Sequence, residues 1–188
     1  VLSSRPLAPW ARYRLALAHE TLGHPEISAG LVANLLAEAP AAPLSRPALA
    51  LLRRSLDAGG DCRLLAGLQR ERLPGTERRT FDLASAECLA RNGRTAEARE
   101  AATALLEREV EDALARDAAE LLVALGAAPE DFRAARLVGL TAYAHREFEF
   151  ALPWLERALG EPGLAAARAW ELGFALARSE FWLGRYGA

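Results

Sequence analysis

Apolar residues recur along the chain with the period of an α-helix. One stripe consists of Ile27, Leu31, Leu35 and Leu36. Positions with this spacing lie on a single face of a helix, and the residues between them here are mostly small or polar. The same spacing recurs within 83–90. The pattern therefore predicts a series of amphipathic helices.

Glycine and proline residues divide this pattern into about ten helices joined by short turns. Because the turns are short, neighbouring helices should be antiparallel. The expected helix pairs are 9–39, 46–73, 77–107 and 129–160. An irregular helix at 109–125 has no clean partner in this scheme, and a final helix at 164–184 is unpaired.

Composition favours the same all-helical interpretation. The 188-residue chain contains 42 Ala and 34 Leu, but Ile, Val and Thr together number only 12. Ala and Leu favour helices, whereas sheets pack best with β-branched residues. The formal charge of −2 lacks the basic excess typical of nucleic-acid binding, and no apolar run approaches the ~20 residues that cross a bilayer. We therefore expect an all-α protein that neither binds nucleic acid directly nor inserts into membranes.

An internal repeat organises the helices. The turn glycines at 23, 59, 93 and 126 are 36, 34 and 33 residues apart. A small residue precedes the turn glycine by seven positions, a second small residue follows it by five, and an apolar residue comes seven later. Three copies read Ala16, Gly23, Ser28 and Leu35; Ala86, Gly93, Ala98 and Leu105; and Gly139, Arg146, Ala151 and Ala158. Small residues at these positions suit close helix crossings, and the period predicts a solenoid.

This pattern resembles the tetratricopeptide repeat family, whose unit is a helix pair of about 34 residues. The closest matches are 139–143 with Phe148, Ala151, Leu155 and Ala158, and the segment 182–186. The resemblance implies a right-handed α-α superhelix of antiparallel helix pairs. The pair at 46–73 departs from the family pattern, with Leu52, Leu64 and Glu71 where small or apolar residues belong. Segments 77–107 and 177–188 also resemble the helical superhelix region of bacterial soluble lytic transglycosylases.

In the tetratricopeptide repeat family, set positions on the first helix of each pair line a concave groove that holds another chain. Carried over by register, these positions are Trp10, Tyr13, Leu17 and Glu20; Thr80, Leu83, Glu87 and Ala90 with Arg91 beside them; Arg133, Arg136, Leu140 and Tyr143; and Glu171, Phe174, Arg178 and Phe181. Aromatic and arginine side chains suit an interface, because rings bury area at low entropic cost and arginine binds carboxylates bidentately. The alternative is that these side chains pack between repeats.

Residues that could carry chemistry do not form a catalytic or metal-binding pattern. His19 and His24 are five apart, with Gly23 between them, whereas a helical zinc pair needs a spacing of four. Cys62 and Cys88 have no nearby Cys or His, and we interpret them as two small buried thiols. We expect no enzymatic activity, no cofactor and no bound metal in this chain.

Three functions fit these observations. The first is a non-catalytic scaffold that binds a peptide or partner protein in the groove. The second is the non-catalytic helical domain of a bacterial cell-wall lytic transglycosylase, and the third is the sensor region of a modular bacterial transcription regulator. The two alternatives place the catalytic or DNA-binding domain elsewhere in a longer chain.

The ends of the sequence suggest a fragment. The chain begins at Val1 and contains no Met. Phe174, Phe181 and Trp182 on the last helix would lack a covering neighbour, so we expect either further chain after residue 188 or a docking surface that permits self-association. No signal peptide opens the sequence, which favours the cytoplasm unless an upstream signal has been removed.

Overall fold

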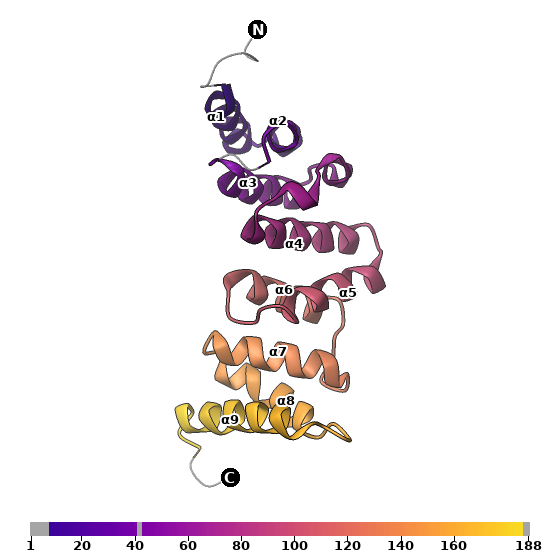
Figure 1. The fold of residues 1–188 in the computed structure, drawn as a ribbon, viewed down its shortest axis with the longest axis vertical. Helices are drawn as coiled ribbons and strands as arrows, with labels where there is room; N and C mark the ends of the chain where they lie inside the picture. The colour runs from indigo at the N-terminus through magenta and orange to yellow at the C-terminus, as the bar shows by residue number, and fades with distance from the viewer. Residues whose placement is uncertain (1–7, 41–42, 186–188) are drawn as a thin grey trace. The chain divides into compact units, whose positions relative to one another are not determined.

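A computed structural model describes residues 8–40 and 43–185 of the chain (Figure 1). Within these ranges every regular element is helical, with nine α-helices, two short 3-10 helices and no strand. The expected all-α class is therefore confirmed. No helix of the described ranges combines the length and apolarity that a bilayer crossing requires.

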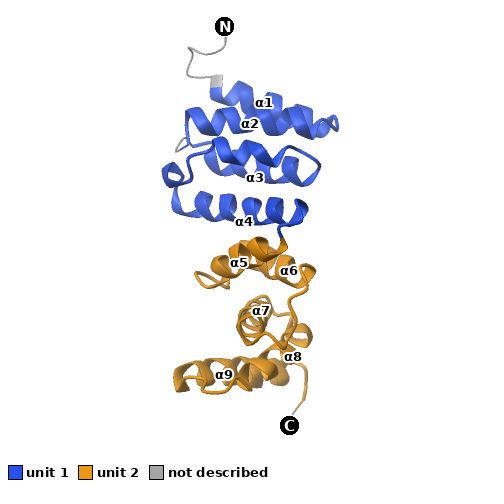
Figure 2. Ribbon diagram, turned by 90° about the vertical axis from the view of Figure 1, so that its right-hand side faces the viewer, with its two compact units in different colours: residues 1–94 blue, residues 95–188 orange. Residues whose placement is uncertain are grey.

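The chain divides into two compact units, residues 1–94 and 95–188 (Figure 2). The boundary falls inside the expected pair 77–107, because the helix beginning at residue 75 belongs to the first unit and the helix beginning at residue 95 belongs to the second. Each unit has its own packing and is described separately.

The first unit contains four α-helices and two 3-10 helices. They are α1 (Ala8–Thr21), α2 (Pro25–Glu38), α3 (Ser45–Asp57), η1 (Cys62–Gly67), η2 (Arg70–Arg72) and α4 (Gly75–Arg91). Successive α-helices pack against each other, and α1 also contacts α3. Leucines at positions 36, 49, 51, 52 and 56 are buried in the core between α2 and α3. These contacts give the stacked hairpin packing that the amphipathic stripes predict.

The segment 61–73 differs from expectation. We expected one helix to pair with α3, whereas the chain forms η1 and η2, of which η1 packs against α2 and α4. Asp61 begins η1 by accepting a hydrogen bond from the backbone N–H of Arg63 at 2.9 Å. The short 3-10 turns bury few apolar residues, which agrees with the weak repeat pattern in this segment.

The interpretation of Cys62 and Cys88 as free thiols is wrong. The two residues form a disulfide, with their Cα atoms 5.7 Å apart, that joins the first residue of η1 to α4. Their separation of 26 residues in sequence concealed this proximity. It arises because η1 folds back onto α4 rather than continuing as a long helix.

The second unit contains five α-helices. They are α5 (Thr95–Leu106), α6 (Ala113–Ala124), α7 (Phe132–Ala144), α8 (Phe148–Leu159) and α9 (Ala166–Trp182). Each packs against the next, and helices two apart in the chain also touch, α5 with α7 and α7 with α9. The helix at 109–125, expected to lack a partner, is α6 and packs against both α5 and α7. The final helix, expected to be unpaired, packs against α8 and α7.

The small residues of the repeat lie where helices cross. Ala16, Ser28, Ala86, Ala98 and Ala151 are fully buried. A Cβ atom added to Gly139 would lie 3.1 Å from the backbone nitrogen of Leu155, so α7 and α8 approach too closely for a larger residue. Arg146 replaces glycine in its turn and has a φ of 62°, the left-handed conformation of Gly23 in the first copy.

Candidate functional site

Two adjoining pockets lie between α7 and α9 in the second unit. One has a volume of about 280 Å³ and is lined by Tyr143, Ala144, Arg146, Phe148, Arg178 and Trp182. The other has a volume of about 430 Å³, and Glu111, Leu140, Tyr143, Glu171 and Phe174 are among its lining residues. The pockets share Tyr143 and Ala144, so they adjoin at these two residues. We call these pockets together the α7–α9 cleft.

Stacked aromatic rings form the wall of the smaller pocket. Phe148 stacks on Trp182 with the ring planes 8° apart and the centroids 6.3 Å apart, and Tyr143 is tilted against Phe148 at 6.2 Å. Trp182 is nevertheless 58% exposed. The rings are thus held by one another while a large apolar surface still faces solvent.

A second aromatic group lies about two to three turns earlier on α9. Phe174, which is 44% exposed, meets Trp170 edge to face with a centroid separation of 5.5 Å. The guanidinium carbon of Arg178 lies 5.6 Å from the Phe174 ring centroid. Phe174 lines the larger pocket and Arg178 lines the smaller one. This cation–π contact therefore lies where the two pockets adjoin.

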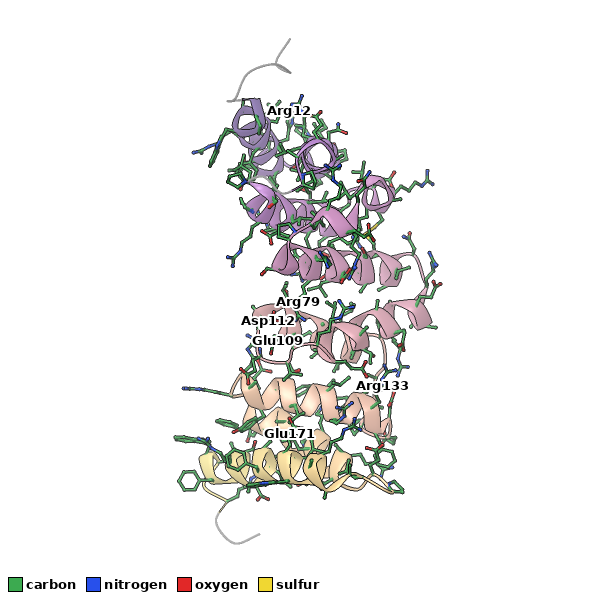
Figure 3. The ribbon with its side chains drawn as sticks, in the orientation of Figure 1. Arg12, Arg79, Glu109, Asp112, Arg133 and Glu171 are labelled. Atoms are coloured by element: carbon green, nitrogen blue, oxygen red, sulfur yellow. A yellow bond between two sulfur atoms is a disulfide. The ribbon has the colours of Figure 1, made fainter. Side chains whose placement is uncertain are left out.

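The two pockets carry opposite charges. Arg146 and Arg178 line the smaller pocket, whereas Glu111 and Glu171 line the larger one. Glu171 projects from α9 toward α7 (Figure 3). Along the cleft, a ligand therefore meets a cationic end, a shared apolar centre at Tyr143 and an anionic end.

The turn that supplies Glu111 is attached to α7 through His145. The Nε2 atom of His145 lies 3.1 Å from the backbone carbonyl oxygen of Asp112, and because a carbonyl only accepts, the ring nitrogen donates. Asp112 in turn begins α6 by accepting from the backbone N–H of Ala115 at 2.7 Å. These bonds fix one wall of the larger pocket.

Three of the ten site residues predicted from the sequence line this cleft, namely Tyr143, Phe174 and Arg178. Leu140 and Glu171, predicted at neighbouring register positions, line it as well. All five come from the register assigned to the first helix of each pair. Of the eight register positions on α7 and α9, these five line the two pockets, whereas Arg133, Arg136 and Phe181 do not.

Arg133, at the start of α7, is paired with α5 and its C-terminal turn. Arg133, labelled in Figure 3, donates to Glu107 at 2.9 Å and to Glu100 at 3.2 Å. These bonds raise the pKa of Arg133, and the hydrogen bond from Arg133 is the main cause that lowers the pKa of Glu107. The charge of half-buried Arg136 lowers the pKa of Glu107 further. Arg133 thus helps to hold α7 on α5.

In the first unit, the predicted carboxylates are engaged in ion pairs with α3. Glu20 of α1 accepts two hydrogen bonds from Arg54, at 2.9 and 3.1 Å, which raise the pKa of Arg54. Glu87 of α4 accepts from Arg53, with a shortest distance of 2.6 Å. Both pairs connect residues 34 positions apart, so they join neighbouring helices of the stack.

The remaining predicted residues of the first unit have different surroundings. Trp10 is 51% exposed, whereas Tyr13 is half-buried against the core cluster. Arg91 donates to the backbone carbonyl of Leu56 and contacts both sulfur atoms of the disulfide. Arg91 therefore belongs to the environment of the disulfide.

The sequence analysis did not assign Arg146, Phe148 and Trp182 to the site. Phe148 and Trp182 lie in the segments that resemble tetratricopeptide repeats, and Trp182 is one of the residues expected to lack a covering neighbour. Arg146 appeared as a departure from the turn glycine. An arginine in a position that favours glycine is a signal that its side chain has another role.

The histidines and acidic residues do not gather around a common centre. His19 and His24 have ring centroids 6.0 Å apart. Within the part of the chain that the structure describes, no three His, Cys, Asp or Glu side chains are placed to hold a metal ion together.

The α7–α9 cleft supplies groups suited to recognition. Its rings offer apolar area, its arginines can pair with carboxylates, and its glutamates can pair with cations. Aromatic and arginine side chains are enriched at protein interfaces. No family model, curated protein or solved structure matches this chain.

Proposed function

We propose that this chain is a non-catalytic scaffold that binds a peptide segment of a partner protein in the α7–α9 cleft. The stack of half-buried Phe148 on exposed Trp182, beside Arg146 and Arg178, is the observation that carries the proposal. Stacked rings exposed to water are costly to maintain unless a ligand covers them. The resemblance to the tetratricopeptide repeat family supports the same function.

The chemistry of the cleft specifies the peptide. An aromatic or aliphatic anchor fits against the rings of Tyr143 and Trp182, and a carboxylate next to that anchor pairs with Arg146 and Arg178. A basic residue further along the peptide would meet Glu171. We therefore expect the ligand to carry an acidic residue, an apolar anchor and a basic residue in sequence along one segment.

A selection from a random peptide library, displayed on phage and panned against the purified chain, tests this proposal. We expect enrichment of peptides with the acidic–apolar–basic arrangement. Trp182→Ala should weaken binding of an enriched peptide roughly thirtyfold, as truncation of a central aromatic anchor commonly costs about 2 kcal/mol. Titration calorimetry measures the change, and circular dichroism verifies that the helices remain.

Charge reversal distinguishes specific recognition in this cleft from nonspecific binding of peptides to apolar surface. Arg178→Glu should remove the preference for the acidic residue, and Glu171→Arg should remove the preference for the basic one. Arg46→Glu, an exposed reversal on α3, is the matched control and should leave the selected profile unchanged. The proposal fails if no peptide family is enriched, or if both cleft reversals return the profile of the unaltered chain.

A further inference from the structure

A pocket of about 580 Å³ in the first unit opens directly onto the Cys62–Cys88 disulfide. The turn at Gly59 and Gly60, the start of η1 and the end of α4 form its walls. Three arginines line it, at positions 63, 91 and 94, together with Asp61. A disulfide that only cross-links a fold needs no such opening, whereas a disulfide that reacts with an external thiol must be reached by it.

The two cysteine residues differ in exposure. Cys62 is half-buried at the first position of η1, beside the exposed turn that leads into that helix. Cys88 is only 4% exposed within α4. A thiol that enters the pocket therefore reaches Cys62 first. Because exchange begins by attack of a thiolate on one sulfur, this difference decides which bond forms.

Arg91 is placed to assist the departure of the other sulfur. Its Nη2 atom donates to the Cys88 sulfur at 3.1 Å and lies 3.4 Å from the Cys62 sulfur. Its Nη1 atom donates to the backbone carbonyl of Leu56, which orients the guanidinium. A fixed positive charge next to a cysteine stabilises its thiolate over the thiol, and a more stable leaving thiolate departs faster.

We propose that Cys62–Cys88 is a thiol-exchange site, at which a dithiol attacks Cys62 and Arg91 stabilises the thiolate that leaves from Cys88. In the first step, the sulfur of the attacking thiolate bonds to the Cys62 sulfur, and the electron pair of the Cys62–Cys88 bond passes to Cys88. In the second step, the other thiol of the reductant loses its proton, attacks the mixed disulfide and releases Cys62 as a thiolate. The reductant loses two electrons and becomes a cyclic disulfide, and the chain gains two thiols.

The opened form differs from the closed one in a defined segment. The disulfide ties the start of η1 to α4, and Leu65 is the one residue of η1 that is buried in the core. Reduction therefore frees the start of η1 from α4, whereas η2 stays attached to α4 through Arg70, which donates to Asp82 at 2.5 and 2.6 Å. The inference concerns the first unit alone and is independent of peptide binding in the α7–α9 cleft.

The rate at which dithiothreitol reduces the folded chain tests the role of Arg91. Arg91→Met should slow reduction roughly fivefold, which corresponds to about 1 kcal/mol in the activation free energy. Arg63→Met removes a charge from the same pocket without a bond to either sulfur, and should change the rate less than twofold. Alkylation of released thiols at timed intervals, followed by mass spectrometry, measures each rate.

The direction in which the reduction rate changes distinguishes stabilisation of the leaving thiolate by Arg91 from a purely structural role. If Arg91 only holds the end of α3 through Leu56, its removal loosens the segment and speeds reduction. A faster or unchanged rate in Arg91→Met therefore overturns the proposal.

A second measurement needs no variant. The chain is incubated with glutathione, the reaction is stopped with acid, and peptic peptides are mapped by mass spectrometry. We expect the glutathione adduct predominantly on Cys62, with Cys88 as the thiol. An adduct predominantly on Cys88, or no adduct on the folded chain, contradicts the proposed direction of attack.

Discussion

Two serine side chains show how single residues hold helices together in this fold. Ser28 of α2 and Ser55 of α3 are fully buried, and the hydroxyl of Ser55 lies 3.0 Å from that of Ser28. A buried hydroxyl needs a partner, because water is not available to replace one. The small size of Ser28, which the repeat pattern required, therefore serves both close packing and a polar contact.

Removing both hydroxyls should cost less than the sum of the costs of removing each one alone. Ser55→Ala leaves Ser28 without its partner and should lower the free energy of unfolding by about 1–2 kcal/mol. In the double variant Ser28→Ala/Ser55→Ala the loss should be smaller than the sum of the single losses by about 1 kcal/mol. Urea denaturation followed by circular dichroism measures these values.

Ser179 offers the matched control. It is equally buried, but its hydroxyl bonds the carbonyl of Ala175 within its own helix. Ser179→Ala combined with Ser28→Ala should be additive within about 0.5 kcal/mol. If the pair of Ser28 and Ser55 is as additive as this control, their hydrogen bond contributes nothing to stability.

At the scale of helices, the distance between α7 and α8 depends on one glycine. A Cβ atom at Gly139 would lie 3.0 Å from Cδ2 and 3.1 Å from the backbone nitrogen of Leu155. The side chain of Leu155 could rotate, but its backbone nitrogen moves only with the helix. The close approach also places Phe148, the first residue of α8, beside Tyr143 in the cleft.

Gly139→Ala should therefore lower the free energy of unfolding by about 1–3 kcal/mol, since the two helices must separate to admit the methyl group. Gly173→Ala in α9 is the comparison, because no atom lies within 4 Å of the added methyl position. That change should raise the free energy of unfolding by up to about 1 kcal/mol through helix propensity. Thermal unfolding distinguishes the two, and equal effects would show that the α7–α8 spacing is not constrained at Gly139.

The positions of helices were predictable from the sequence, and their contacts were less so. Turn glycines and prolines mark helix ends through local conformational preferences. The outer ends of the expected pairs 9–39 and 77–107, and both ends of the expected helix 164–184, therefore lie within two residues of observed helix ends. Segment 61–73 lacks such a pattern and forms 3-10 turns instead. The disulfide and the ion pairs of Glu20 and Glu87 join residues 26 to 34 positions apart, and helical periodicity carries no information on such pairs.

The candidate site was predictable in the same partial way. The repeat register identified Tyr143, Phe174 and Arg178, because positions one or two turns apart on a helix share a face. Register could not identify Arg146 and Trp182, which lie at or beyond helix ends, where no periodic pattern applies.

At the scale of the whole molecule, the two compact units raise the question of whether they unfold together. The disulfide lies wholly within residues 1–94. Closing a loop between residues 26 positions apart restricts the unfolded chain, and by loop entropy the bond should stabilise the first unit by about 3.5 kcal/mol. The second unit gains nothing from the bond if it unfolds independently.

Hydrogen exchange of the oxidised and reduced chain tests this independence. On reduction, amides of α3 and α4 should exchange faster, because the first unit loses about 3.5 kcal/mol of stability. For amides that exchange only when the whole first unit unfolds, the exchange rate should rise by up to about 300-fold. Amides of α7 and α8 should keep their rates, and they serve as the internal control within the same sample. Equal acceleration in α7 and α8 would mean that residues 1–188 unfold as one cooperative body. Acceleration confined to 62–72 would instead mean that the bond stabilises only η1 and η2. The free energy of unfolding of the other helices in the first unit would then not depend on the disulfide.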